Sequence, residues 1–373
     1  MRVALVLEQL LSRVPGGAGR YSRELAGALA ASMPAGTALT GWVGAHGDFA
    51  AARVPGVEGP HRLALGHRAL AVAWERGLGP APRATDVIHA PTLLMPPRRR
   101  TPVVVTIHDA VPWTHPETLT PRGVAFHLRM GARAAAQADR IIAPSHAAAD
   151  SLSKVLDLGD RVRVVPLGMS STVTLPPDAR ARRRTLGLPD RYLVTVATLE
   201  PRKGLDVLLD ALVDVPEIPL VIIGPDGWGG VDVASAAHKR GLTDRVIHLG
   251  QISDANLAVV VSGALALVQP SREEGFGLPV LEAMSLGTPT VISSAAALTE
   301  LAGGAALVTP VGDAAALMVA LSEITGDAGR REILAVAGRQ RAGAFTWVTA
   351  AAQTWNVYRE ALGLDATQDS PPE

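Results

Sequence analysis

The fold prediction starts from one stretch, Ser271-Arg272-Glu273-Glu274-Gly275-Phe276-Gly277-Leu278-Pro279-Val280-Leu281-Glu282-Ala283-Met284. The apolar run Leu265–Val268 that precedes it is typical of a buried parallel strand. A glycine-rich turn follows, and Pro279 is placed to open a helix, because proline is well tolerated in the first helical turn. The stretch therefore predicts a strand, a turn and a helix.

The turn has the features of an anion-binding site. Gly275 and Gly277 permit positive φ and bring no side chain, so the amides of Gly277 and Leu278 can point at a ligand along the positive end of the helix. Glu274 in the loop and Glu282 on the helix add carboxylates, which accept hydrogen bonds from hydroxyls. Together they predict a ligand with phosphate and hydroxyls, such as a nucleotide sugar. A glutamate near a helix start is also a common partner of the helix dipole, which is the alternative for Glu282.

The spacing Glu274-Gly-Phe-Gly-Leu-Pro-Val-Leu-Glu282 resembles the E-x7-E signature of the retaining glycosyltransferases of family 4. The resemblance implies an α/β protein of GT-B fold, with two Rossmann-like doubly wound parallel-sheet domains facing a cleft. It also implies that Glu282 binds ribose hydroxyls and that Glu274 binds hydroxyls of the donor sugar. The implied contacts to sugar and phosphate come from Gly275, Phe276, Gly277, Leu278 and Pro279.

Length and composition limit the alternatives. A chain of 373 residues exceeds what one core usually accommodates, so two domains are expected. The 48% hydrophobic and 19% charged residues exclude wholesale disorder. Lys and Arg balance Asp and Glu at 35 each, so no global charge favours a nucleic-acid partner. The absence of cysteine excludes disulfides, thiolate metal sites and a cysteine nucleophile.

The hydrophobic pattern predicts where the domains lie. We expect an acceptor-side domain over 1–169, completed by a crossing C-terminal helix over 346–362, and a donor-binding domain over 170–345. The linker is expected within 170–184, where the apolar pattern lapses. Residues 363–373 are polar and are expected to form a disordered tail.

A glycine-rich loop over 12–19 follows the first predicted strand and precedes a helix predicted from Arg20 to Ala31. The dinucleotide-binding fingerprint fails, because Ser22 stands at the third glycine position. Gly16-Gly17-x-Gly19-Arg20-Tyr21 is instead similar to the family loop that approaches the donor phosphate, which implies donor contacts for Gly16 and Gly17. An ordinary tight turn explains the loop alone equally well.

Two predicted strands, over 86–91 and 102–109, end in polar residues, where doubly wound sheets bind their ligands. His108-Asp109-x-x-Pro112, followed by Pro116-Glu117, resembles the H-D-x-x-P…P-E segment of many family 4 enzymes, often mannosyltransferases. The resemblance places His108 beside the transferred sugar and Asp109 in the donor site. His89 is expected behind them.

The strand predicted over 191–198 is followed by Leu199-Glu200-Pro201-Arg202-Lys203-Gly204. Adjacent cations between a strand and a helix suit a diphosphate, because arginine binds bidentately and lysine acts as a point charge. The alternative is a pair of surface charges. The segment is similar to the family's Arg-Lys-Gly element, which implies that Arg202 and Lys203 stabilise the leaving diphosphate.

Together with the motifs, the resemblance implies a retaining glycosyltransferase with His108, Glu274, Arg202 and Lys203 at its catalytic centre. The chain has no D-x-D motif, so we expect neither a metal requirement nor a cofactor besides the nucleotide-sugar donor. The His108-Asp109 segment favours mannose from GDP-mannose. The acceptor stays open between a glycan, a lipid-linked sugar and a small molecule. The alternatives are a GT-B epimerase and a noncatalytic nucleotide-sugar-binding partner subunit.

Localisation and partners follow from weaker signals. The run Val3–Leu7 is too short for a signal-peptide core, and Leu257–Val268 is shorter than the ~18 residues of a membrane span, so a cytoplasmic protein is expected. Arginines over 98–100 and in the helix predicted over 122–138 suit either an anionic membrane surface or acceptor, as at the inner membrane face, or a solvated basic face. Nothing in the sequence determines the oligomeric state.

Overall fold

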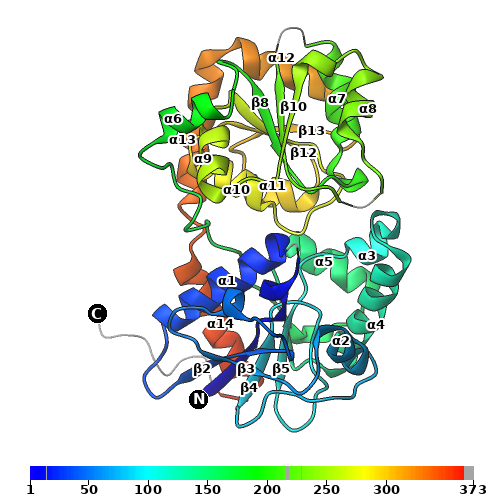
Figure 1. Cartoon of the computed structure of the whole chain (residues 1–373), viewed down its shortest axis with the longest axis vertical. Helices are drawn as coiled ribbons and strands as arrows, with labels where there is room; N and C mark the ends of the chain where they lie inside the picture. Colours follow the sequence, from blue (N-terminus) through cyan, green and yellow to red (C-terminus); the bar gives the residue numbers. More distant parts are fainter. Residues whose placement is uncertain (14, 216–217, 228, 365–373) are drawn as a thin grey trace. The chain divides into compact units, whose positions relative to one another are not determined.

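The computed structural model describes residues 1–364 except 14, 216–217 and 228 (Figure 1). The chain divides into two units. Unit 1 comprises Met1–Trp113, Pro121–Gly168 and the chain from Thr346, and unit 2 comprises Thr114–Thr120 and Met169–Phe345. Each unit contains a parallel sheet with helices on its faces, as the two-domain α/β prediction requires. From residue 365, the tail predicted over 363–373 lies outside the described residues.

Unit 1 has a parallel sheet in the order β3-β2-β1-β4-β5-β6-β7. The described strands are β1 (Arg2–Val6), β2 (Ala38–Val43), β3 (Glu58–Arg62), β4 (Val87–Ala90), β5 (Val103–Thr106), β6 (Arg140–Ala143) and β7 (Val162–Val164). The order reverses between β1 and β4, which is where doubly wound sheets bind ligands at the strands' carboxyl ends. β1, β4 and β5 are almost entirely buried, as their apolar sequences predict.

The described helices of unit 1 are α1 (Gly16–Ala31), α2 (His67–Glu75), α3 (Val111–Thr114, whose last residue groups with unit 2), α4 (Pro121–Gln137), α5 (His146–Val155) and α14 (Trp347–Ala361). Short 3-10 turns lie at Glu8–Leu11, Ala50–Ala52 and Gly159–Arg161, and another at Pro116–Thr118 in unit 2. Although it is last in sequence, α14 packs against α1, β5 and β6. Its aromatic residues Trp347, Trp355 and Tyr358 are buried, as expected of packing residues.

The glycine-rich segment corrects one prediction. Helix α1 begins at Gly16, not at Arg20. Pro15 takes the N-cap position, and the Gly19 N–H donates to the Pro15 carbonyl at 2.9 Å. The helix can include these glycines because Gly19 packs closely on Pro15, where a Cβ at Gly19 would lie 2.3 Å from the proline Cβ. The second half of the predicted loop, from Gly16, is therefore the first turn of a helix.

Unit 2 has a parallel sheet in the order β10-β9-β8-β11-β12-β13. The described strands are β8 (Leu193–Val196), β9 (Leu220–Ile223), β10 (Val246–Gly250), β11 (Ala266–Gln269), β12 (Thr290–Ser293) and β13 (Leu307–Thr309). The helices are α6 (Ala179–Thr185), α7 (Leu205–Val213), α8 (Val233–His238), α9 (Asp254–Ser262), α10 (Leu278–Ser285), α11 (Ala296–Ala302), α12 (Ala314–Gly326) and α13 (Ala328–Ala342), with 3-10 turns at Pro201–Lys203 and Thr243–Arg245. Its core joins α7 and α12 to the buried strands.

Part of the predicted linker is helical. The linker was expected within residues 170–184. Helix α6 starts inside that stretch, at Ala179, and ends one residue beyond it, at Thr185. None of its residues is buried, so it carries no apolar stripe that the sequence could reveal. At its start, the Asp178 carbonyl accepts from the Arg182 N–H at 3.1 Å, and the Asp178 carboxylate forms an ion pair of 2.7 Å with the Arg182 guanidinium.

Two of the basic residues of unit 1 form ion pairs. The guanidinium of Arg98 lies 2.8 Å from Asp139, and that of Arg129 lies 2.8 Å from Glu75. These pairs are partly exposed, which fits a solvated basic face. In the described part of the chain, no helix combines the length and hydropathy that crossing a bilayer requires.

Candidate functional site

The turn after β8 places Arg202 and Lys203. Both lie in the 3-10 turn Pro201–Lys203, and Gly204 then adopts φ 69 before α7 begins. A Cβ at Gly204 would lie 2.2 Å from the Pro270 carbonyl oxygen. Only glycine fits, because the turn is packed against the chain that follows β11. The Arg272 N–H donates to the Arg202 carbonyl at 2.8 Å and joins the two segments.

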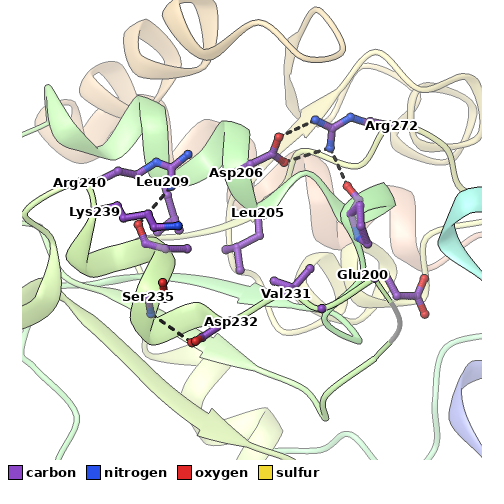
Figure 2. A pocket seen from close by; sticks show the side chains of 14 residues that line it. Glu200, Leu205, Asp206, Leu209, Val231, Asp232, Ser235, Lys239, Arg240 and Arg272 are labelled. Carbon is purple, nitrogen blue, oxygen red and sulfur yellow. Dashed lines mark hydrogen bonds and ion pairs between the residues drawn. The ribbon is translucent and has the colours of Figure 1, made fainter.

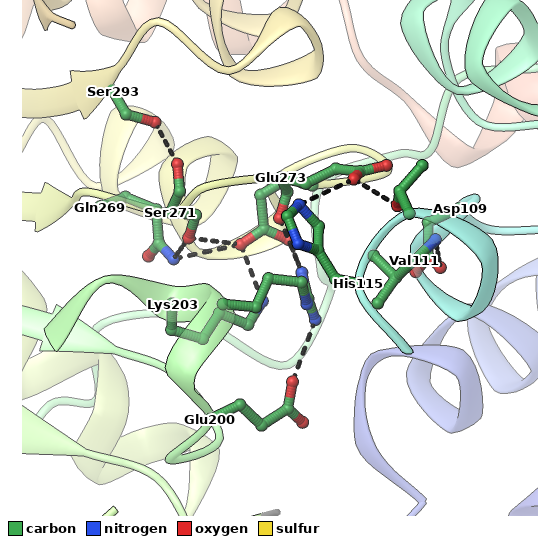
Figure 3. Close-up of polar contacts among 12 residues, drawn as sticks. Asp109, Val111, His115, Glu200, Lys203, Gln269, Ser271, Glu273 and Ser293 are labelled. Atoms are coloured by element: carbon green, nitrogen blue, oxygen red, sulfur yellow. Dashed lines mark hydrogen bonds and ion pairs between the residues drawn. The ribbon is translucent and has the colours of Figure 1, made fainter. Parts of the chain in front are cut away.

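Arg202, Lys203 and Glu274, here named the cation–glutamate cluster, meet in unit 2. Figure 3 shows the surroundings of Lys203. Lys203 Nζ donates to Glu274 Oε1 at 2.7 Å, and Arg202 Nη1 donates to Glu274 Oε2 at 3.2 Å. Arg202 also donates to the Glu273 carbonyl at 2.8 Å and to Glu200 at 3.3 Å. The side chains of the cluster are only 10–16% exposed. Sequence segments 70 residues apart thus form one charged site.

Neighbouring polar side chains fix the orientation of Glu274. Ser271 Oγ donates to Glu274 Oε1 at 2.7 Å, and Gln269 Nε2 donates to Ser271 Oγ at 2.8 Å. Ser293, at the end of β12, donates to the Ser271 carbonyl at 2.5 Å. Figure 3 shows this chain of contacts leading from Ser293 through Ser271 toward Lys203. Gln269 ends β11 and Ser293 ends β12, so the supporting groups come from two neighbouring strand ends.

The charges determine what Glu274 can do. Burial raises the pKa of Glu274, but the charges of Lys203 and Arg202, with hydrogen bonds from Lys203 and Ser271, outweigh it and lower the pKa to about 2. Glu274 is therefore an anion at neutral pH. It can accept hydrogen bonds from hydroxyls but has no proton to donate.

The start of α10 supplies backbone donors. Gly277 is the N-cap with φ 108, and Leu278 and Pro279 open the helix. A Cβ at Gly277 would lie 2.6 Å from Leu298 Cδ2, so a larger residue cannot replace it without movement. Pro279 has no N–H, and the Val280 and Leu281 amides donate to the Gly277 carbonyl at 3.0 and 3.1 Å. The amides of Gly277 and Leu278 therefore lie at the positive end of the helix dipole. This is the geometry that binds anions at helix starts.

Phe276 and Glu282 are both buried. The Phe276 side chain is 7% exposed and packs edge-on against Phe345, with ring centroids 5.7 Å apart. Its side chain thus belongs to the core, and only its backbone is placed to contact a ligand. Glu282 is 3% exposed on α10. Such burial is uncommon for a glutamate that only complements the helix dipole at the surface.

Unit 1 places His108 and Asp109 just after β5. His108 Nε2 lies 2.9 Å from the Pro91 carbonyl, so Nε2 carries the hydrogen and Nδ1 is the acceptor. Burial lowers the pKa of His108, outweighing the Pro91 carbonyl and the Asp109 charge, so the imidazole is neutral at pH 7. Asp109 Oδ1 accepts from the Val111 N–H at 3.1 Å, at the start of α3. Gly16 and Gly17 lie exposed in the first turn of α1.

Residues behind His108 form a buried network that sequence reasoning identified only in part. His89, expected there, is fully buried and bonds Tyr358 Oη at 2.7 Å and Thr106 Oγ1 at 2.9 Å. Tyr21 Oη bonds the same Thr106 oxygen at 3.0 Å, and its ring meets that of His108 edge-on at 4.7 Å. The roles of Tyr358 and Thr106 have no signal in the sequence, because their partners are remote in the chain.

Unit 2 also contains a pocket of ≈ 440 Å³ beside the 3-10 turn (Figure 2). Leu205 and Val231 line it, and an Asp206–Arg272 ion pair of 2.7 Å lies at its edge. Glu200, which pairs with Arg202, also lines this pocket.

Glu273, in the loop after β11, has further contacts. It accepts a hydrogen bond from the Thr114 hydroxyl at 2.6 Å, and its carboxylate lies 3.3 Å from the His115 imidazole. No motif in the sequence indicates these contacts.

Two parallel-sheet Rossmann-like domains, with a charged cluster and a helix start at the strand ends of one of them, are the architecture of the GT-B fold. The family model for glycosyl transferases group 1 matches residues 179–341, and that for glycosyltransferase family 4 matches residues 15–172. The chain belongs to this family of glycosyltransferases and is a transferase acting on glycosyl groups.

Individual proteins agree with this assignment. The chain is 30% identical over 287 residues to O-antigen chain mannosyltransferase B of Escherichia coli, covering 73% of this chain and 74% of the relative. Sucrose-phosphate synthase of Thermosynechococcus elongatus superposes with a TM-score of 0.78 at 24% identity, over 97% of this chain and 99% of that one. Anabaena HepE in complex with UDP and glucose superposes with a TM-score of 0.74 at 21% identity, over 96% and 100%. The two structures support the fold alone.

Proposed function

We propose that the protein transfers mannose from GDP-mannose to a hydroxyl of a glycan, lipid-linked or small-molecule acceptor, with retention of configuration and without a metal ion in the transfer step. One observation carries the proposal: Arg202 and Lys203 are held together by buried Glu274 beside strand ends. Two cations in fixed positions suit the two phosphates of a nucleoside diphosphate. The transferase class itself rests on the family.

In the proposed complex, Arg202 and Lys203 bind the diphosphate. An ammonium group has three N–H donors, so its bond to Glu274 leaves others for phosphate oxygens. The backbone at Gly277 and Leu278 contributes donors at the positive end of α10. Negative charge accumulates on the leaving diphosphate in the transition state, and these fixed charges stabilise it where it develops.

The carboxylates bind hydroxyls in this proposal. Glu274, with a pKa of about 2, accepts hydrogen bonds from the donor sugar rather than acting as an acid. Glu282 accepts from the ribose. His108, neutral and with Nδ1 as an acceptor, contacts a hydroxyl of the mannose, with Asp109 and the Gly16–Gly17 backbone adding donor contacts.

The bond changes balance without a cofactor. The bond between the sugar C1 and the β-phosphate oxygen breaks, and its electron pair leaves with GDP. A bond forms between C1 and the acceptor oxygen on the same face of the sugar. The acceptor proton passes to the departing phosphate oxygen. No oxidant, reductant or metal takes part.

The donor rests on two observations. The His108-Asp109 segment resembles that of mannosyltransferases, and the Escherichia coli relative is named as a mannosyltransferase. The HepE structure contains UDP and glucose, which belong to that protein. A direct comparison of the two donors therefore tests the choice.

The test is a transfer assay with GDP-mannose and UDP-glucose, each with a panel of sugar and lipid-linked acceptors and with EDTA. We expect acceptor-dependent GDP release and an α-mannoside product whose anomeric configuration NMR identifies as retained. Lys203→Ala should abolish product formation. Transfer from UDP-glucose alone would contradict the donor, loss of transfer in EDTA would contradict metal independence, and full activity of Lys203→Ala would contradict the site.

A further inference from the structure

Glu8, His46 and His67, here named the Glu8–His cluster, meet in unit 1 outside every group assigned above. His46 Nε2 lies 2.7 Å and His67 Nδ1 lies 2.8 Å from the same oxygen, Glu8 Oε1. Within the residues that the structure describes, this is the one grouping of three His, Asp or Glu side chains suited to hold a metal ion. His46 and His67 are 38 and 59 residues from Glu8, so no spacing motif indicates the cluster.

The topology explains why these residues meet. Glu8 follows β1, His46 follows β2, and His67 opens α2 after β3. These three strands are neighbours in a parallel sheet, so their carboxyl ends lie along one edge. That edge is where parallel sheets bind ligands.

The backbone preorganises the carboxylate. The Gly44 N–H donates to Glu8 Oε2 at 2.7 Å, which orients the group so that Oε1 faces both imidazoles. A Cβ at Gly44 would lie 2.9 Å from the Leu65 carbonyl oxygen, so the close approach requires glycine. The Ala45 N–H donates to that same carbonyl at 2.8 Å and ties the loop after β2 to the loop after β3. A hydrogen bond to the non-ligating oxygen is typical of the support behind metal ligands.

We infer that the Glu8–His cluster is a binding site for a divalent transition-metal ion, with zinc the physiological candidate. Two imidazole nitrogens and one carboxylate oxygen form a ligand set that zinc prefers. Three protein ligands leave a fourth position for water or another small ligand. The ion would join the loops that follow β1, β2 and β3.

The geometry permits entry of the ion with small movements. Zinc ligands about 2.0–2.1 Å from the metal lie roughly 3.3 Å apart, so each imidazole has to withdraw from Glu8 Oε1 by about half an ångström. His67 is free to do so, since its side chain is 56% exposed, and its exposure also opens a path from solvent. Glu8, at 2% exposure, is the fixed ligand.

The inference is independent of the proposed function. The cluster belongs to unit 1, whereas Arg202, Lys203 and Glu274 belong to unit 2. The proposed transfer step uses no metal, so EDTA should empty the Glu8–His cluster without stopping transfer. The zinc-binding measurement and the transfer assay therefore test the two proposals separately, and one proposal can fail while the other holds.

The test uses the full chain with its purification tag removed and with metals stripped by EDTA. Protein incubated with zinc chloride and desalted is analysed for zinc by elemental mass spectrometry, and its melting temperature is recorded with and without zinc. Cobalt chloride provides a second readout, because a His-ligated tetrahedral Co²⁺ ion absorbs visible light. We expect one zinc per chain, a zinc-dependent rise in melting temperature and a cobalt spectrum.

His67→Ala is the informative variant, since loss of an exposed side chain should leave the fold intact. Loss of a residue that only supports a metal ligand typically lowers metal affinity roughly 10–100-fold. Because His67 is itself a proposed ligand, His67→Ala should lower zinc affinity by more than that. His61→Ala is the matched control, because His61 lies on β3 and forms an exposed pair of 3.5 Å with Glu58 of the same strand. Zinc bound equally by wild type and His67→Ala, or not bound by wild type, would overturn the inference and leave a hydrogen-bonded cluster only.

Discussion

Glu274 holds two cations within hydrogen-bond distance while remaining buried and ionised. The usual cost of burying a carboxylate is offset by Lys203, Arg202 and Ser271. The same contacts preorganise Arg202 and Lys203 before any donor arrives. Preorganised charges are effective in catalysis because they need not rearrange as the reaction proceeds.

Replacing Lys203 by alanine should reduce kcat/KM for the donor at least about 100-fold, because a charge that binds and stabilises the leaving diphosphate is lost. Initial rates over a range of donor concentrations measure the effect, and circular dichroism checks the fold. Lys154→Ala is the control, since Lys154 is exposed on α5. Equal losses in the two variants would contradict a specific role for Lys203.

Glu274→Gln should make the stability of the protein less dependent on pH in the acidic range. The folded pKa of Glu274, about 2, is below its unfolded value of 4.5, so its contribution is fully present above pH 4.5 and is lost as pH falls toward 2. The difference in melting temperature between wild type and Glu274→Gln should therefore be constant from pH 8 to 5. It should narrow between pH 4.5 and 3.5. A difference that widens there would contradict the assigned charge state.

The elements that position the site are the turns after β8 and β11. Gly204 is the residue that allows them to meet, since its φ is positive and the Pro270 carbonyl occupies the space of a side chain. The cluster thus depends on backbone packing between two loops as well as on charge.

Gly204→Ala should lower both kcat and stability. Its cost combines about 1–2 kcal/mol of left-handed backbone strain with the collision at Pro270. Gly241→Ala is a matched control, because Gly241 has the same φ of 69° but no atom within 4 Å of an added Cβ. Chemical denaturation should show a larger loss for Gly204→Ala, and only that variant should lose activity. Equal losses of stability would refute the close approach.

The sequence predicts some elements well and others poorly. β11, the turn and α10 are evident because a buried strand, glycines and Pro279 follow one another. Strand β3 (Glu58–Arg62) is not evident, since Pro60 is its one buried residue and no apolar pattern exists. α1 starts earlier than predicted because glycine normally indicates a loop, whereas here it permits close packing on Pro15.

The candidate site, too, is predictable from the sequence only in part. Arg202, Lys203 and Glu274 are recognisable as charged residues after strands, so their placement at strand ends could be anticipated. Their mutual pairing could not, because it depends on the register between β8 and β11. The sequence does not reveal the Glu8–His cluster either, because its residues meet only through the order of the strands in the sheet.

At the level of the whole molecule, α14, the last helix in the described part of the chain, completes the first unit. α14 contributes Tyr358 to the His89 network and buries Trp355 against unit 1. Unit 1 therefore cannot complete its core until the chain has been synthesised to α14. Unit 2, by contrast, is formed largely by one continuous segment, Met169–Phe345.

Trp355→Ala should destabilise unit 1 by about 3–5 kcal/mol, the typical cost of removing a buried tryptophan. Val348→Ala on the same helix is the control, since Val348 is 73% exposed. Limited proteolysis identifies which unit opens, and we expect new cleavage within residues 1–168 for Trp355→Ala. Cleavage confined to unit 2 would be inconsistent with the packing of α14.

The central claim is that Arg202 and Lys203 hold a nucleoside diphosphate without a metal. Calorimetric binding of GDP, UDP, ADP and dTDP, with and without magnesium, tests it most directly on wild type and Lys203→Ala. We expect that GDP binds, that magnesium changes its affinity little, and that Lys203→Ala loses binding. Failure of all four nucleotides to bind, or binding that requires magnesium and survives the substitution, would contradict it.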